Sequence, residues 1–247
     1  YFPLLVQGPI SDYKKLSETL YTPVPFSGKN FLFGFERVLW GYFKKLVVAD
    51  RILIPVKALI DSAEEYTGVY VVLLIFFYSI QIYADFTGGI DITIGLSDAL
   101  GIELKENFKH PFFSKSTKEY WRRWHITLGT WFRDYLYFSL GGSRYSKIKT
   151  IRNIFIVWFL TGLWHGASWN FVLWGLYFFV ILVTEKLFLK KLLEKAPKII
   201  SHIYTLLLIV FGWFIFIACD LEAPMEYLRV MFASPLISGA AVYQLLR

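Results

Sequence analysis

The sequence predicts an all-α protein, a polytopic bundle of membrane helices, and three observations support this fold class. Hydrophobic residues make up 56% of the 247 residues and aromatic residues 20%, with a mean hydropathy of +0.48. This is more apolar than a soluble domain of that length requires. Long apolar runs recur along the chain, and the few ionisable residues inside them are typical of helices that line a polar interior. We expect one membrane-embedded domain over residues 1–247.

The first hundred residues predict helices of unequal character. Residues 1–25 contain four prolines, so a short helix and a loop are expected there. Residues 31–60 are apolar but carry several charges, which favours a tilted or interfacial helix. Residues 69–84 form an uninterrupted apolar run, which Asp85 should end near an interface. Residues 86–104 are rich in glycine and predict a broken or closely packed helix.

Asp85 and Asp91 fall in this glycine-rich region or at its edge. They could line a polar path through the membrane. Equally, each could cap a helix end or pair with a nearby arginine.

The central segment opens with a capping box, in which Ser116 is the N-cap and Glu119 the third helical residue. Apolar residues then recur every three or four positions, which predicts a single helix with one buried face as far as the glycines at 141 and 142. His125 should point into packed aromatic residues on that face. The residues of the face are Trp121, Trp124, Leu128, Trp131 and Tyr135.

Positive charge is concentrated in residues 103–149, which hold ten lysines or arginines against four acidic residues. Beside membrane helices, this pattern indicates a cytoplasmic surface that faces anionic lipids, and not a nucleic-acid interface. Residues 186–198 form a second basic loop. A single span over residues 154–183 would place the two loops on opposite sides and would be about 45 Å long. We therefore expect a break or a re-entrant element at His165–Gly166.

Residues 199–218 are the plainest transmembrane candidate, with His202 near one end as an interfacial residue. His110 is expected in a loop.

His165 lies within the apolar run 154–183 and is a functional candidate by default. Gly162 and Gly166 beside it could admit a neighbouring helix. The structural alternative for His165 is a hydrogen bond to Thr161.

Three motifs carry a family resemblance: Trp121-Arg-Arg-Trp-His-Ile-Thr-Leu128, Trp131-Phe-Arg-Asp-Tyr-Leu-Tyr137 and Trp164-His-Gly-Ala167. They resemble the membrane-bound O-acyltransferases (MBOAT), and specifically the alginate O-acetyltransferase-like branch. Residues 7–10, 83–88 and 219–221 extend the resemblance over nearly the whole chain. The D-alanyl transferases of lipoteichoic acid are a sister branch, but Arg122-Arg123 and residues 140–144 favour polysaccharide acetylation. Members are roughly twice as long, so an internal fragment lacking terminal membrane helices is expected.

The resemblance implies a multi-pass protein of the bacterial cytoplasmic membrane, with His165 as the catalytic histidine and His125 as a second required one. It implies no bound cofactor; acetyl-CoA or a carrier-protein thioester is the donor substrate. An extracytoplasmic acetyltransferase partner would complete transfer to a polysaccharide.

The chemistry of the two histidines agrees with this assignment. An imidazole that titrates near neutral pH can deprotonate a hydroxyl acceptor, the role expected of His165, while His125 would orient or polarise the acyl carbonyl. No nucleophile triad stands out, which favours direct transfer. Arg133 and Asp134 could hold the wall of an acyl tunnel or bind donor phosphates, and Arg122 or Lys118 could also bind these phosphates. A fixed structural pair is the favoured interpretation of Arg133 and Asp134. The single Cys219 gives no metal cluster, and no metal site is expected. The candidate substrate-binding residues are Trp164, Asn170, Arg122, Arg133, Asp134 and Asp85.

Two other functions remain open at this point. One is the transfer of D-alanyl or another acyl group to a cell-wall polymer. The other is a proton-coupled transporter, in which intramembrane histidines and aspartates carry protons without transferring an acyl group.

Overall fold

The computed structural model describes residues 1–5, 7–22, 24–61 and 68–217, and within these ranges the chain forms helices, turns and loops but no strand. The all-α prediction is confirmed. Cys219 and the motif at residues 219–221 lie outside the described residues. Within the described ranges, three helices are long and apolar enough to cross a membrane, namely Gly68–Ala99, Trp169–Lys195 and Lys198–Ile217. The helix Lys198–Ile217 confirms the helix predicted for residues 199–218, as far as the described residues extend.

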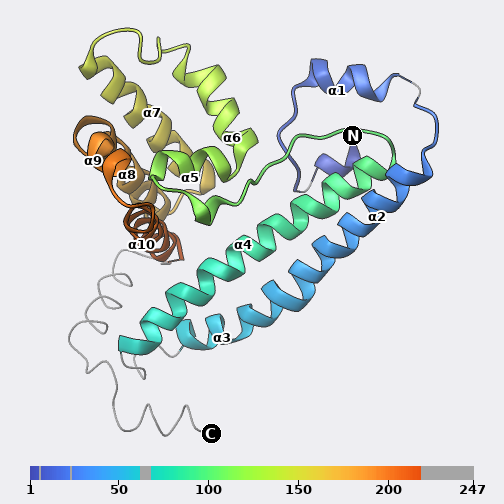
Figure 1. Ribbon diagram of the computed structural model, residues 1–247, viewed down its shortest axis with the longest axis horizontal. Helices are drawn as coiled ribbons and strands as arrows, with labels where there is room; N and C mark the ends of the chain where they lie inside the picture. The colour runs from blue at the N-terminus through green and yellow to red at the C-terminus, as the bar shows by residue number, and fades with distance from the viewer. Residues whose placement is uncertain (6, 23, 62–67, 218–247) are drawn as a thin grey trace, which may run out of the picture.

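A long helical pair forms one side of the molecule (Figure 1). After the short helix α1 (Tyr13–Leu20), the chain is continuously helical through α2 (Gly28–Tyr42), the π-helix η2 (Phe43–Ala49) and α3 (Asp50–Asp61). This stretch runs antiparallel to α4 (Gly68–Ala99). Glycines bring the two backbones together, since a Cβ at Gly34 would lie 2.4 Å from the carbonyl oxygen of Gly95. The close packing expected for residues 86–104 is confirmed.

Helix α4 continues through Asp85 to Ala99, so the prediction that Asp85 ends the helix is wrong, and of the two alternatives for the following residues the closely packed helix is found, not the broken one. The reason is charge pairing. Asp85 accepts a hydrogen bond from Lys45 at 2.6 Å, and Asp91 pairs with Arg37 at 2.9 Å and also with Lys44. Neutralised by cations of α2 and η2, both carboxylates stay inside the helix. Asp91 thus has the arginine partner that the pairing alternative predicted, whereas the partner of Asp85 is a lysine.

The central segment is two short helices, α5 (Thr117–Arg123) and α6 (Ile126–Trp131), followed by the π-helix η5 (Phe132–Tyr137). The N-cap at Ser116 is confirmed, whereas the single continuous helix is wrong. The chain breaks at His125, whose φ of 47° lies in the left-handed region. Beyond the break the expected buried face continues only to Leu128, which is buried, since Trp131 is 44% and Tyr135 62% exposed.

Helices α7 (Lys147–His165) and α8 (Trp169–Thr184) form a hairpin, and the break expected at His165–Gly166 is confirmed. The two helices are antiparallel and nearly touch. A Cβ at Gly162 would lie 2.5 Å from the Phe171 carbonyl oxygen, and one at Gly175 would lie 2.4 Å from the Trp158 oxygen. Of the two glycines expected to admit a neighbouring helix, Gly162 does so, while Gly166 lies in the turn.

The hairpin places the two basic segments on the same side of the helices. Lys186, in the π-helix η6 (Glu185–Leu189), lies 3.4 Å from the hydroxyl of Ser143. The Glu185 carboxylate accepts the backbone N–H of Thr117 at 2.8 Å. A single span over residues 154–183 would have separated these segments. The hairpin removes this conflict with the positive-inside rule.

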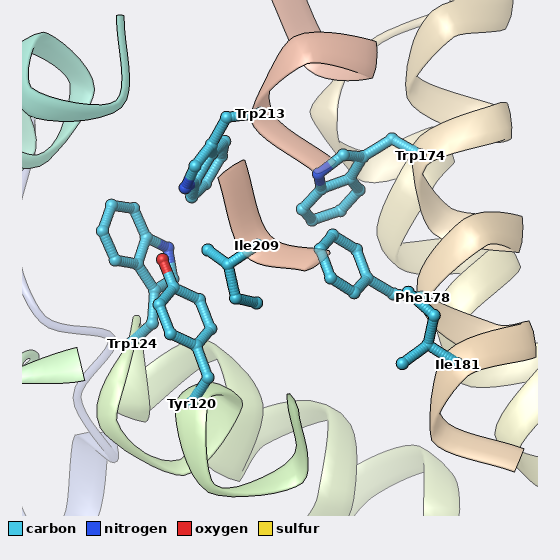
Figure 2. Packing of buried hydrophobic residues seen from close by; sticks show 7 residues of the cluster. All are labelled: Tyr120, Trp124, Trp174, Phe178, Ile181, Ile209 and Trp213. Carbon is cyan, nitrogen blue, oxygen red and sulfur yellow. The ribbon is translucent and has the colours of Figure 1, made fainter. Parts of the chain in front are cut away.

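Helix α9 (Lys190–Lys195) leads into α10 (Lys198–Ile217), which packs against α8 and α4. Between these helices and α5 lies a buried aromatic cluster (Figure 2). The ring of Trp124 stacks on that of Tyr120 at 5.7 Å and approaches that of Trp213 at 4.8 Å. Aromatic rings bury large areas. The cluster therefore fixes the short α5, and with it His125, against the long helices.

The hairpin predicts the sidedness of three exposed positions. In the complete protein with native cysteines replaced, single cysteines at Ser146 and Lys191 should react with an impermeant maleimide only after cell lysis. A cysteine at Ser168, in the hairpin turn, should react in intact cells. The first two positions lie in the basic segments, which the positive-inside rule places in the cytoplasm. Labelling of Ser146 and Lys191 from opposite sides would contradict the hairpin, and labelling of both from outside would contradict the cytoplasmic orientation.

Candidate active site

His125 and His165 line the same cavity, which has a volume of about 1490 Å³. They come from different parts of the chain: His165 is the last residue of α7, and His125 forms the break between α5 and α6. Trp164 contacts both, with its ring centroid 6.1 Å from that of His125 and 4.9 Å from that of His165. The fold thus brings together the two histidines that the sequence singled out.

His165 is held by aromatic edges. Trp174 of α8 and Phe216 of α10 meet its ring nearly at right angles, with centroids 4.9 and 5.2 Å away. The hydroxyl of Thr161 donates to the Val157 carbonyl oxygen at 2.7 Å. The structural alternative, a hydrogen bond between Thr161 and His165, is therefore not found. Among the described residues, no hydrogen bond occupies either ring nitrogen of His165, which leaves both available to a substrate.

His125 is more deeply enclosed, with 9% of its surface exposed. The ring of Phe86 meets it at 4.9 Å, nearly perpendicular. Its Nδ1 lies 3.3 Å from the side-chain oxygen of Asn107. His125 therefore has a polar partner on one side and the cavity on another, as expected for an imidazole that acts on a ligand.

The cavity extends along the α7/α8 hairpin. The histidines lie towards the hairpin turn, while the opposite end is lined by cations of both basic segments. The lining residues of the cavity on α7 run from Ile154 to His165, about 16 Å along the helix axis, which is roughly half the thickness of the membrane core. The cations that line the basic end are Lys115, Lys118, Arg122, Lys186, Lys190 and Lys198.

Several of these cations lack a neutralising partner. In the described part of the chain, Lys118 and Arg122 form no ion pair. Lys190 does form one, a long pair with Glu194 at 3.9 Å. Partial burial, together with the charges of Arg122 and Lys190, lowers the pKa of Lys118. Among the acids that line this region, Glu185 is engaged by the backbone of α5. The basic end thus carries an unsatisfied positive field, which attracts anions.

The remaining candidate residues divide between the cavity and its surroundings. Trp164, Arg122, Arg133 and Asp85 line it, and Asp85 does so while paired with Lys45. Asn170 does not: it is buried, and its amide donates to the Phe216 carbonyl oxygen at 2.9 Å, which ties α8 to α10.

Arg133 and Asp134 form the local pair that the sequence suggested, with Nε and Oδ1 2.8 Å apart. The carboxylate of Asp134 is solvent exposed and lies outside the cavity lining, and the neighbouring guanidinium lowers its pKa. The geometry of the pair therefore supports a surface role for Asp134, with Arg133 reaching the cavity.

The structure adds two polar residues that sequence reasoning missed. Asn107 contacts His125, and Glu185 caps the start of α5. Glu185 follows directly after an apolar run, and a charge at such a boundary is a usable signal. Asn107 belongs to no periodic pattern, and only the folded chain shows what it contacts.

Comparison with known proteins adds a separate line of observation. Residues 1–222 match the family model described as MBOAT, membrane-bound O-acyltransferase family. The chain is 36% identical over 232 residues to the probable alginate O-acetylase of Azotobacter vinelandii, covering 94% of this chain and 46% of that protein. It is 31% identical to the peptidoglycan O-acetyltransferase of Helicobacter pylori, with coverages of 94% and 45%.

A third relative, the teichoic acid D-alanyltransferase of Bacillus subtilis, is 27% identical, with coverages of 87% of this chain and 59% of that protein. The chain thus spans about half the length of the curated relatives that it matches.

Proposed function

Because the chain belongs to the membrane-bound O-acyltransferase family, we propose that it forms the core of an enzyme that transfers an acetyl group onto a polysaccharide. The observation that carries the proposal is the cavity that joins His125 and His165 to a cationic end. Two of the relatives are named as O-acetylases of alginate and peptidoglycan, which supports a glycan hydroxyl as acceptor.

The donor is a thioester that enters from the cytoplasmic, basic end. Lys118 and Arg122 would bind its phosphate groups, for which guanidinium and ammonium groups are suited. Acetyl-CoA and an acylated carrier protein both present phosphates next to a thioester, so both fit this end. The largely apolar lining of the cavity would then guide the acyl group towards His165.

His165 acts as the general base. It takes the proton of the acceptor hydroxyl while the oxygen attacks the thioester carbonyl, so the new C–O bond forms and the C–S bond breaks. The proton can then pass to the departing thiolate. Since both ring nitrogens of His165 are free of protein hydrogen bonds in the described chain, one can accept this proton without breaking a structural contact. His125 is the second required group.

We further propose that the protein lies in the bacterial cytoplasmic membrane, with the donor inside and the polysaccharide outside. A separate extracytoplasmic acetyltransferase is the proposed partner protein.

The test is thioester turnover by the complete purified protein in the presence of the partner and glycan. Release of free thiol from acetyl-CoA or from an acetylated carrier protein supports the proposal, and competition between the two identifies the donor. Faster turnover with a D-alanyl carrier would assign the chain to the D-alanyl branch. Intact thioesters combined with proton flux across proteoliposomes would overturn acyl transfer in favour of transport.

Charge reversal at the basic end should weaken donor binding and leave the chemical step largely intact. We expect Arg122→Glu to raise the KM for the donor about tenfold or more, as is usual for loss of a charge-assisted phosphate contact of 1.5–3 kcal/mol, with kcat changed little. The matched control is Lys29→Glu, which reverses an exposed charge on α2 away from the cavity. Steady-state kinetics with varied donor checks this. An unchanged KM in Arg122→Glu would show that this end does not receive the donor.

A further inference from the structure

The contacts of Asn107 bear on what His125 can do. We propose that the carboxamide oxygen of Asn107 accepts the Nδ1–H of His125 and thereby holds Nε2 as the unprotonated nitrogen that faces the substrate. Asn107 is then a positioning residue of the transferase. The tautomer follows from geometry alone; its importance for turnover rests on the proposed function.

The orientation of the Asn107 amide is fixed by the backbone. Its Oδ1 lies 3.0 Å from the amide nitrogen of Thr127, and a backbone N–H can only donate, so this atom must be the oxygen. The hydroxyl of Thr127 lies 2.9 Å from the same oxygen and itself accepts the N–H of Ile10 at 3.0 Å. Its own hydrogen is therefore free to be donated to Asn107. Three groups converge on one acceptor, and His125 Nδ1 is the third.

An oxygen that faces an imidazole nitrogen selects the tautomer. In the neutral ring one nitrogen carries hydrogen and the other a lone pair, and two lone pairs facing each other repel. The hydrogen therefore resides on Nδ1. Since Asn107 is fully buried, water does not compete with the imidazole for its oxygen.

The backbone around His125 is held by the same residue. The carbonyl oxygen of Asn107 accepts the N–H of Ile126 at 3.0 Å, while the N–H of Lys109 donates to the Arg123 oxygen at 2.9 Å. Asn107 thus accepts hydrogen bonds from the first two backbone N–H groups of α6. The side chain of His125, although His125 is the N-cap residue, accepts neither of them. These bonds maintain the left-handed backbone of His125, an uncommon conformation for a residue with a Cβ.

The consequence concerns the division of roles between the histidines. A neutral ring with its hydrogen on Nδ1 can accept a hydrogen bond at Nε2 but cannot donate one there. It cannot polarise an acyl carbonyl, the role expected from the sequence, because polarisation requires a donor. His125 instead accepts the hydrogen bond of a proton-bearing group, such as the acceptor hydroxyl, and orients that group beside His165.

The tautomer can be measured without turnover. Nitrogen-15 NMR of the complete protein with labelled histidine, with the His125 signal assigned by its absence in His125→Gln, should show a protonated Nδ1 and an unprotonated Nε2. A protonated Nε2 would overturn the proposal. If this measurement succeeds and no thioester is turned over, the proposed function falls while the tautomer stands. The converse result, turnover with the opposite tautomer, removes this inference alone.

Variants test the functional part. Asn107→Leu removes the acceptor, and we expect a mixture of His125 tautomers with kcat lower by about 10²-fold or more. Asn107→Asp keeps an acceptor oxygen and should recover part of the rate. The control is Asn153→Leu, because Asn153 is equally buried but bonds only the carbonyls of Leu140 and Gly142 and the side chain of Arg152. If folded Asn107→Leu kept the wild-type tautomer and rate, Asn107 would have no positioning role. Should that variant fail to fold, the wild-type spectrum and Asn107→Asp decide the question.

Discussion

Replacement of His165 with alanine should lower acyl transfer by roughly 10²- to 10⁴-fold, the contribution of a general base, and leave a folded protein. In the described chain the ring of His165 contacts aromatic rings and forms no hydrogen bond, and it lines a cavity that already exists. Its removal therefore enlarges that space without leaving a buried polar group unpaired. Single-turnover release of thiol measures the rate, while size-exclusion chromatography and donor binding measure folding.

His202→Ala is the matched control. His202 also lies near one end of a membrane helix, but its Nδ1 bonds the Ser114 carbonyl oxygen at 2.9 Å, a structural contact. This variant should stay active with slightly lower stability. Near-normal turnover in a well-folded His165→Ala preparation would remove the base assignment. Asp85, which lines the same cavity, would then be the next candidate, with Asp91 after it.

Gly175→Leu should prevent the α7/α8 hairpin from closing and cause a large loss of stability. A Cβ at Gly175 would lie 2.4 Å from a backbone oxygen of α7, and a backbone atom cannot turn away as a flexible side chain can. Overpacking usually costs about 1–3 kcal/mol and sometimes more, and small residues are what allow membrane helices to approach closely. The thermal unfolding midpoint in detergent and the yield of monodisperse protein measure the effect.

Gly28→Leu is its control, because nothing lies within 4 Å of a Cβ at Gly28. It introduces the same side chain at a helical glycine with open space around it. A Gly175→Leu protein as stable as Gly28→Leu would show that the two helices do not pack as closely as described.

The most accurate predictions from the sequence concern helices and breaks that are determined by residues close together in the chain. Apolar runs predicted α8 and α10, and the length of residues 154–183 together with the charge on either side predicted the break after His165. The helix continuing past Asp85 could not be predicted from local sequence. The lysine that neutralises Asp85 is forty positions away along the chain, and pairing over such a distance appears only in the folded protein.

The same limit applies to the site. Spacing and resemblance identified His125 and His165, and the fold places both in one cavity. The helical spacing across residues 121–135 nevertheless predicted a continuous helix, because the bonds that break it come from Asn107, outside the repeating pattern. Tertiary hydrogen bonds overrode local propensity there. The local sequence also could not predict the orientation of the Asn170 side chain, because its hydrogen-bond partner lies on α10.

The ion pairs between α2 or η2 and α4 also constrain how the protein is made. A charged side chain at the centre of a membrane helix costs roughly 2.5–3.5 kcal/mol during insertion. Asp91 would impose that cost on α4, a candidate membrane span, if α4 entered the lipid without its partners. Asp91 pairs with Arg37 and Lys44, and Arg37 also pairs with Glu106, so the two cations meet two carboxylates. Arg37 and Lys44 precede Asp91 by 54 and 47 positions, so both cations are synthesised before α4 and can pair with Asp91 as α4 enters the lipid.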